Sequence, residues 1–585
     1  MARKSGRIHQ ATWRSMLPLL VLVLLVPAVS GCAQIPASGP VVAGEEVDPG
    51  VELHAIVPGP AIGASPSEIV NGFIQAMISA EGEYEVARSY LTPAAAARWK
   101  PSNKTYVFAD LSISNELSAG AGSRPEREAA QQTSGILTLS VTETIDADGH
   151  LAQVYPPQRT PIDLDLTMVD DEWRIDALPD ATLLAEIDLD FVFSSYNLYY
   201  LDPARSFLVA DPRWLPDTAS TPARIAALLL RGPPAWLRGA VVTAFPKGTQ
   251  LRAPAGVQVQ DGVAQVSVTP EARQADAGQR GLMRAQLLAT LQPVVAVQDV
   301  QILVDSARLD VDEVTVHSEP SMSESPALLM GDRVQKLVDG NPSPVESIAA
   351  LRDSDADALA MDYSSDRFAI LADDRKELRL AGEDGLEAPV LSGDELTVPS
   401  FDWRGWVWST EVDCQGQITA VSADSEVVQV HADWLAGREL SSLRVARDGV
   451  RVLIASTDAA GTGHLELAAI TRDEDGVPHS LARAPEATMG SSVSSVRDAA
   501  WVGPARVVVL GTAVDSTDLR VLQVEVGGPP REALPRLEEP LSLTAATGMG
   551  SVLVSSSEHD VLTQAGAQWI SLSQAQGATW VAFPG

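Results

Sequence analysis

The chain has 585 residues, of which 42 are basic and 77 acidic, so its formal net charge is −35 at pH 7. This excess of carboxylates argues against a nucleic-acid-binding protein and against adsorption to an anionic membrane surface, because both need Lys and Arg. With 45% hydrophobic residues the chain can bury large cores, and its length predicts roughly three or four domains.

The first 32 residues predict export. A basic head without acidic residues precedes a short apolar core at 17–29, which is too short for a comfortable membrane span. The segment 29–32 reads VSGC and resembles the lipobox of bacterial lipoproteins. The resemblance implies a signal peptide over 1–31, cleavage between Gly31 and Cys32, and S-diacylglycerol and N-acyl groups on Cys32. The alternative is an ordinary export signal with an incidental cysteine.

The segment that follows predicts a lipid-anchored tether. Residues 32–64 are rich in Pro, Gly, Ala and Val without a helical or strand period, and a flexible coil of this length spans roughly 30 Å. After cleavage 38 basic and 77 acidic residues remain, a net charge of −39. If Cys32 carries lipid, Cys414 has no partner, so we expect no intramolecular disulfide.

Residues 65–190 predict an α+β domain. Ser65 to Glu68 form a capping box with proline at the first helical position, and apolar residues then recur at helical spacing. Alternating strands follow at 137–141 and 162–168, and a further strand contains Trp173-Arg174-Ile175. This combination resembles the cystatin-like folds of the nuclear transport factor 2 type, in which such a strand closes the sheet.

Residues 195–318 predict a second α+β domain, with the order strand, strand, helix, hairpin, helix, strand. Asp261-Gly262 separates two alternating runs at 257–260 and 263–266, which predicts a two-residue hairpin turn with the apolar residues on one face. The order of elements, together with the strands over 199–209, resembles the GerMN domain of sporulation and germination proteins.

After a polar linker at 319–327, the helical pattern nearly stops. Short apolar strand cores recur near Leu328, Ala369, Val407, Val452, Val507 and Val552. A period of about 40–50 residues with several strands per unit is typical of a β-propeller, and about six blades fit residues 328–585, the first of them poorly defined. One large β-sandwich is the alternative, because no strict WD or kelch signature is present.

The sequence contains no constellation that predicts an enzyme, a cofactor or a resident metal. Zinc-helix, nucleophile-elbow, phosphate-loop and dinucleotide fingerprints are all missing. Asp353, Asp355 and Asp357 alternate as calcium ligands can, but the Gly and distal Glu of an EF-hand are absent. Pairs such as Asp373-Asp374 and Asp163-Asp165 are interpreted as solvated faces.

Three tryptophans, Trp403, Trp406 and Trp408, lie within six residues. They predict either a sugar- or peptide-stacking platform near the propeller axis or core packing between blades. On a strand Trp406 and Trp408 would point one way and Val407 the other, which favours burial of at least one face.

Taken together, the lipobox, tether, cystatin-like region, GerMN region and propeller resemble the actinobacterial lipoprotein LpqB family across essentially the whole mature chain. The resemblance implies a protein anchored by lipid to the extracytoplasmic face of the cell membrane. It further implies a protein partner, the external part of a sensor histidine kinase (MtrB-like), and a role in two-component signalling and cell-wall homeostasis. The rival hypothesis is a cell-wall glycan-binding protein, or a hydrolase or lyase, that uses the propeller axis.

Overall fold

The computed structural model describes residues 57–114, 132–252, 256–294, 297–345, 348, 351, 356–383, 385–485, 489, 493–514, 516–558 and 560–585. Cys32 and the cleavage point after Gly31 lie outside these residues, as do Asp353 and Asp355. Within them, no helix is both long enough and apolar enough to cross a membrane.

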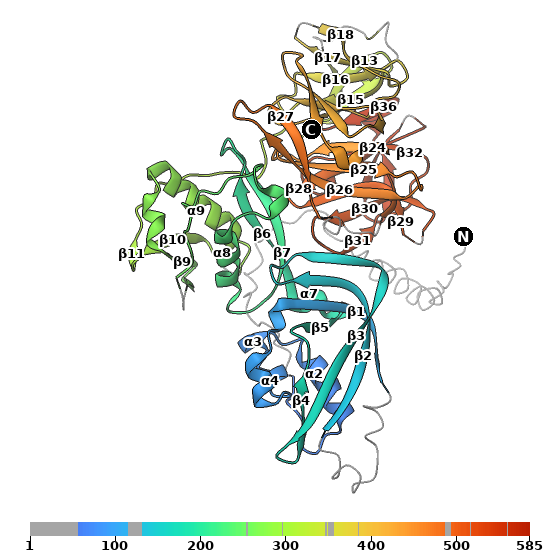
Figure 1. The fold of residues 1–585 in the computed structure, drawn as a ribbon. Coiled ribbons are helices and arrows are strands. Elements are labelled where there is room, and N and C mark those ends of the chain that lie inside the picture. Colours follow the sequence, from blue (N-terminus) through green and yellow to red (C-terminus); the bar gives the residue numbers. More distant parts are fainter. Residues whose placement is uncertain are drawn as a thin grey trace, which may run out of the picture. The chain divides into compact units, whose positions relative to one another are not determined.

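The first domain packs three short helices on a five-stranded mixed sheet (Figure 1). Its helices are α2 (Pro66–Ala76), α3 (Glu81–Arg88) and α4 (Pro93–Arg98). Its strands are β1 (Lys104–Ile113), β2 (Gln132–Asp146), β3 (Leu151–Val169), β4 (Glu172–Ala177) and β5 (Thr182–Ala185), in the order β4-β3-β2-β1-β5. Strand β5 runs parallel to β1, and the other pairs are antiparallel.

The predicted capping box at Ser65 and the predicted strand with Trp173 and Ile175 are confirmed. The Ser65 hydroxyl accepts a hydrogen bond from the Glu68 amide, and the Glu68 carboxylate accepts one from the Ser65 amide, which completes the capping box. Strand β4, which carries Trp173 and Ile175, lies at the sheet edge, and both side chains are buried in the core beneath the helices.

The second domain contains a long two-stranded ribbon, two helices and a four-stranded sheet. The ribbon pairs β6 (Phe193–Leu201) with β7 (Leu208–Pro216), and the helices are α8 (Thr221–Arg231) and α9 (Ala277–Leu291). The sheet has the order β11-β10-β9-β8, with β8 (Val257–Gln260), β9 (Val263–Val268), β10 (Asp299–Val304) and β11 (Ala307–Arg308).

The predicted hairpin is confirmed in its register. Val257 lies opposite Val266, and Val259 lies opposite Ala264. The turn residue Asp261 adopts a left-handed φ of 51°, as a two-residue hairpin turn requires. Ala264 and Val266 are buried, whereas Val259, near the open edge of the sheet, is 40% exposed.

The third domain is a propeller of six four-stranded blades, as predicted. The first blade consists of β36 (Ala578–Ala582), β12 (Ala327–Met330), β13 (Arg333–Val338) and β14 (Asn341–Pro344), and the second of β15 (Ala356–Met361), β16 (Phe368–Ala372), β17 (Glu377–Gly382) and β18 (Gly385–Ser392). The third blade consists of β19 (Ser400–Phe401), β20 (Val407–Ser409), β22 (Gln417–Val421) and β23 (Val427–His431), and the fourth of β24 (Arg438–Val445), β25 (Arg451–Thr457), β26 (Gly463–Arg472) and β27 (Pro478–Arg483). The fifth blade consists of β28 (Val493–Gly503), β29 (Arg506–Ala513), β30 (Leu519–Glu525) and β31 (Pro530–Ala533), and the sixth of β32 (Pro540–Thr544), β33 (Leu553–Ser556), β34 (Val561–Ala565) and β35 (Gln568–Ser571). The third and fourth blades join edge to edge where β23 meets β27, and β21 (Asp413–Cys414) pairs with β24.

The first strands of the six blades, β36, β15, β19, β24, β28 and β32, contact one another in sequence and close a ring around the axis. The apolar peaks that predicted the period fall in or, for Val552, directly before the second strand of each blade. The first blade is poorly defined in the sequence because its innermost strand, β36, comes from the other end of the domain, about 250 residues after β12. This pairing closes the ring without a free edge between first and last blades.

Candidate functional site

The propeller axis, the site considered for a saccharide or an enzyme, contains a cavity of only about 50 Å³. Five of the six inner strands line it with residues such as Leu359, Val445, Ala500 and Leu543, and the third blade contributes Pro399, directly before β19. Ligand pockets usually measure about 300–1,000 Å³, whereas about 15 Å³ holds one water. The axis therefore accommodates a few waters and no sugar ring.

The structure places the three predicted tryptophans in different surroundings. Trp408 is fully buried, and its indole N–H donates to the Asp402 carboxylate at 3.2 Å. Trp406 is half-buried against the apolar core of the third and fourth blades. Trp403 packs edge-on against Phe207 of the second domain, with ring centroids 4.9 Å apart. The preferred core interpretation thus fits Trp408, while Trp403 belongs to a domain junction.

The carboxylate candidates do not assemble into a metal centre. The described residues contain no group of three or more His, Cys, Asp or Glu side chains that could hold a metal ion. The Asp357 carboxylate accepts a hydrogen bond from the Arg375 amide at 2.8 Å. Asp373 and Asp374 are exposed, as are Asp163 and Asp165, in agreement with solvated faces.

Buried charges instead gather where the second domain meets the propeller. Arg451 is 2% exposed and Asp448 is 1% exposed, and the Arg451 Nε lies 2.7 Å from the Asp448 Oδ2. The same guanidinium donates to the backbone oxygen of Ala210 in β7 at 3.0 Å and lies over the Trp501 ring. An arginine of the propeller thus binds the ribbon of the neighbouring domain from inside a closed interface.

Two further arginines bind segments outside the propeller in the same manner. Arg404 lies 3.3 Å from Asp202, which is 1% exposed and follows β6. Arg447, on the loop after β24, lies 3.0 Å from Glu319 in the linker between the domains. Arg447 also donates to the backbone oxygens of Trp501 and Ala546 on two neighbouring blades. The linker is therefore fixed at Glu319 to the centre of the propeller.

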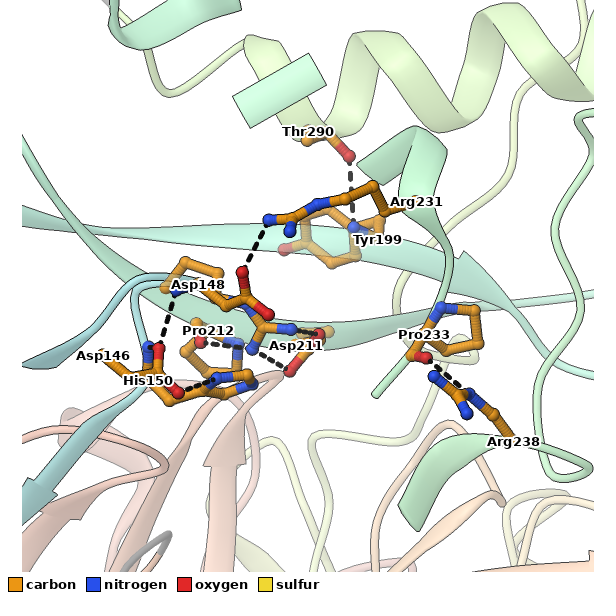
Figure 2. A network of polar contacts seen from close by, with 12 residues as sticks. Asp146, Asp148, His150, Tyr199, Asp211, Pro212, Arg231, Pro233, Arg238 and Thr290 are labelled. Atoms are coloured by element: carbon orange, nitrogen blue, oxygen red, sulfur yellow. Dashed lines mark hydrogen bonds and ion pairs between the residues drawn. The ribbon is translucent and has the colours of Figure 1, made fainter. Parts of the chain in front are cut away.

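The first domain reaches the second through the turn between β2 and β3 (Figure 2). Gly149, in that turn, accepts a hydrogen bond from the Trp214 amide in β7 at 2.7 Å. Asp148 forms an ion pair with Arg231 of α8 at 2.7 Å, and both side chains are about half exposed. Asp146 caps the turn by accepting from the amide of His150 at 2.9 Å.

Trp214 connects all three domains. Its side chain is 2% exposed and belongs to the apolar core of the first domain, although its backbone lies in the second. Its indole N–H donates to the backbone oxygen of Gly527 in the propeller at 2.7 Å. Next to it, Gln153 of β3 donates to Gly528 at 2.9 Å. Strand β7 is thus the common support of both junctions.

The pKa values of two carboxyl groups near β7 are shifted in opposite directions. Burial raises the pKa of Asp211, although the Arg213 guanidinium, 2.5 Å away, opposes the rise. Burial alone would also raise the pKa of Asp146, but hydrogen bonds from His150 and Asp148 outweigh it and lower that pKa. The difference follows from exposure, because the Asp211 side chain is 4% exposed and that of Asp146 is 58% exposed.

Sequence reasoning did not find these junctions. The segment around Arg447-Asp448-Gly449 forms a turn, but Arg447 and the neighbouring Arg451 contact partners 54 to 241 residues away in the chain. The sequence signal for these junctions is weak. Several arginines lie at turns between blade strands, but an arginine at such a turn can equally be exposed to solvent.

The comparisons with known proteins cover each domain. The family model "Lipoprotein LpqB, N-terminal domain" matches residues 59–190, the model "Sporulation and spore germination" matches 197–310, and the model "Lipoprotein LpqB beta-propeller domain" matches 332–584. Lipoprotein LpqB of Thermobifida fusca is 29% identical over 554 residues, which cover 83% of this chain and 86% of that one. Lipoprotein LpqB of Streptomyces coelicolor is 27% identical and covers 96% of each chain.

The chain belongs to the LpqB lipoprotein family. The family's description as lipoproteins agrees with the expectation of a lipid anchor, and its position at Cys32 stays a prediction. Two solved structures are similar to parts of this LpqB chain. TolB from Acinetobacter baumannii is 14% identical with a TM-score of 0.32, covering 44% of this chain and 65% of that one. The first GerMN domain of the sporulation protein GerM from Bacillus subtilis is 18% identical with a TM-score of 0.17, covering 21% and 92%.

Proposed function

We propose that this LpqB protein is a non-enzymatic accessory protein, anchored through lipid on Cys32 to the extracytoplasmic face of the cell membrane. It binds the external part of an MtrB-like sensor histidine kinase and thereby modulates two-component signalling and cell-wall homeostasis. The observation that carries the proposal is the pair of junctions on β7, which hold three domains as one binding platform through Trp214 and Arg451.

Two features support a platform rather than a catalyst. The axial cavity is too small for a saccharide, and its arginines are engaged within the protein. A tether also raises the local concentration of the platform at the membrane, so a modest affinity suffices for occupancy. The protein changes the sensor's activity only if it binds the two signalling states unequally.

The test reconstitutes the full-length kinase in lipid vesicles and adds the lipidated chain at increasing ratios. We expect a saturable change in the rate of autophosphorylation. The Cys32→Ser protein, which cannot be lipidated, should need a much higher concentration for the same change. An unchanged rate at every ratio, together with measurable turnover of a wall polymer, would favour an enzyme.

A further inference from the structure

The connection from the first domain to the second carries two large apolar side chains in solvent. It consists of a single 3-10 turn at Glu186–Asp188 and the helix α7 (Leu189–Val192), which link β5 to β6 (Figure 1). Ile187 is 89% exposed and Phe191 is 53% exposed. We call these two side chains the α7 ridge. Single exposed apolar residues are common, but two large ones together on one element are typical of an interaction surface.

The spacing along the chain explains why the two side chains are exposed together. Residues four apart lie on the same side of a helical backbone, so Ile187 and Phe191 project in a similar direction. Leu189 and Val192 project to the other side and are buried in the apolar core of the first domain. The buried side alone therefore attaches the connection to its domain, and the α7 ridge is not needed for packing.

Carboxylates flank the α7 ridge. Helical spacing places Glu186 and Asp190 on one flank and Asp188 on the other. Among the described residues none of these three side chains forms an ion pair or a hydrogen bond. Burial raises the pKa of Glu143 in β2; a hydrogen bond from Thr142 opposes this rise, and the charges of Glu186 and Asp190 add to it. The negative charge beside the ridge is thus not neutralised within the described protein.

This charge decides between the possible occupants of the α7 ridge. Residues 33–56 of the chain itself contain four acidic residues and no lysine or arginine, so they do not complement the flanks. A second copy of the chain would bring the same carboxylates to the contact. An anionic membrane surface would be repelled for the same reason. A protein segment with apolar residues bordered by lysines or arginines complements both the ridge and its flanks.

We propose that the α7 ridge docks a basic, amphipathic segment of a partner protein. Apolar residues of this segment cover Ile187 and Phe191, and its lysines or arginines face the flanking carboxylates. An amphipathic helix offers this arrangement, because polar side chains border its apolar stripe. The inference rests on the proposed function only for the identity of the partner, the external part of the sensor.

The experiment uses the expected mature chain, residues 32–585, with Cys32→Ser so that no lipid group binds the probe. The probe is a fluorescein-labelled peptide of about 18 residues, with leucines at helical spacing and lysines elsewhere. A Glu–Leu peptide of equal length reverses its charge, and a Lys–Gln peptide removes its apolar stripe. Fluorescence anisotropy should show the Lys–Leu peptide binding about tenfold more tightly than either of the others.

The apolar part of the contact has matched controls. Ile187→Ser and Phe191→Ser should each weaken binding of the Lys–Leu peptide about tenfold. Ile62 is 95% exposed in the first domain, and Ile570 is 47% exposed on the sixth blade. Ile62→Ser and Ile570→Ser remove apolar side chains of similar exposure elsewhere, and the affinity should stay within about twofold of the unmodified value.

The charged part of the contact is tested in the same way. Glu186→Gln combined with Asp190→Asn should weaken binding about tenfold and reduce its dependence on salt. Asp163→Asn combined with Asp165→Asn removes two exposed charges from β3, and the affinity should stay within about twofold. Because Glu186 and Asp190 repel the Glu143 carboxylate, their replacement should not lower the Tm, which separates a lost contact from a lost fold.

Equally tight binding of the Lys–Gln peptide, equal weakening by the control variants, or no effect of the ridge variants would overturn the inference. Flotation of the same protein with phosphatidylglycerol vesicles, if it depends on Ile187 and Phe191, would assign the α7 ridge to the membrane and also overturn it.

The ridge variants, with Cys32 restored and lipidated, are then added to the reconstituted kinase. Ridge-dependent peptide binding without any effect of the unmodified chain on the kinase would refute the proposed function and leave the α7 ridge as a docking surface. A kinase effect that Ile187→Ser and Phe191→Ser do not change would refute the ridge as the docking surface for the sensor and leave the proposed function standing.

Discussion

The two junctions on β7 use opposite means. Toward the propeller, the second domain is bound by the almost completely buried Arg451, which pairs with Asp448 of its own domain and donates to the Ala210 oxygen of β7. Toward the first domain, it is bound through an exposed turn whose ion pair, Asp148 with Arg231, is about half solvated. Desolvated charges are costly to separate, whereas exposed pairs contribute little.

The exposure of these contacts determines how strongly each one sets the arrangement of the domains. The buried pair of Arg451 and Asp448 lies within the propeller and holds the donor to β7 in place, whereas the exposed pair of Asp148 and Arg231 itself joins two domains. At the exposed junction the backbone contact of Gly149 and the Trp214 ring buried in the first domain's core replace the charges as the main contributors.

Replacement of the buried arginine should give the largest effect. In Arg451→Leu, the Asp448 carboxylate remains buried without its partner, and the Ala210 oxygen loses a donor. We expect a loss of about 3–5 kcal/mol in the free energy of unfolding, measured by urea denaturation.

A second variant separates the buried charge from the lost contact. In Arg451→Leu combined with Asp448→Asn no charge stays buried, so a substantial part of the stability should return. A loss below about 1 kcal/mol for the single variant would contradict the division between the two junctions.

The second prediction concerns the backbone contact at the exposed junction. Gly149 has a φ of +83°, and a Cβ there would lie 3.0 Å from the Trp214 backbone oxygen. Gly239 has a φ of +87° with nothing within 4 Å of an added Cβ, so it reproduces the backbone cost alone. We expect Gly149→Ala to destabilise by about 1 kcal/mol or more beyond Gly239→Ala in thermal unfolding.

Hydrogen exchange at the Trp214 amide, which donates to Gly149, reports the same contact locally. The exchange rate of this amide should rise in Gly149→Ala and should stay unchanged in Gly239→Ala. Equal behaviour of the two variants would mean that the turn does not fix β7.

The sequence predicts the elements of the fold but not the contacts between the domains, because the signals for the elements are local and those contacts are not. Local signals such as the capping box at Ser65, the Asp261-Gly262 turn and the spacing of apolar strand cores act within a few residues or repeat regularly. The first blade escaped a clear definition because β36 and β12 are distant in the chain.

The candidate sites depend on contacts that no local pattern encodes. Trp214 lies in β7, and nothing in its sequence neighbours indicates that its ring enters the core of another domain. The expectation at Cys32 rests on a contiguous motif and lies outside the described residues.

The third prediction concerns the exposed ion pair. Arg231 and Asp148 are 59% and 48% exposed, so their attraction is screened by water. Arg231→Ala should cost at most about 0.5 kcal/mol, and a double-mutant cycle with Asp148→Ala should give a coupling energy of similar size. A coupling energy above about 2 kcal/mol would place this pair with the buried ones.

The smallest effect should come from the charge of Asp146, and it should depend on pH. Burial alone would raise its pKa, but the hydrogen bonds from His150 and Asp148 lower it below the ordinary value. A carboxyl group whose pKa is depressed by folding stabilises the protein above its unfolded pKa of about 4, and this contribution is lost as the pH falls through the folded pKa.

In Asp146→Asn the side-chain oxygen still accepts hydrogen bonds, but the negative charge is gone. The Tm of the unmodified chain should therefore exceed that of Asp146→Asn at pH 6, and the gap should close as the pH falls below about 4. A gap that stays constant, or widens with acid, would show that the charge of Asp146 does not stabilise the turn, and the backbone contact of Gly149 would then account for this junction without it.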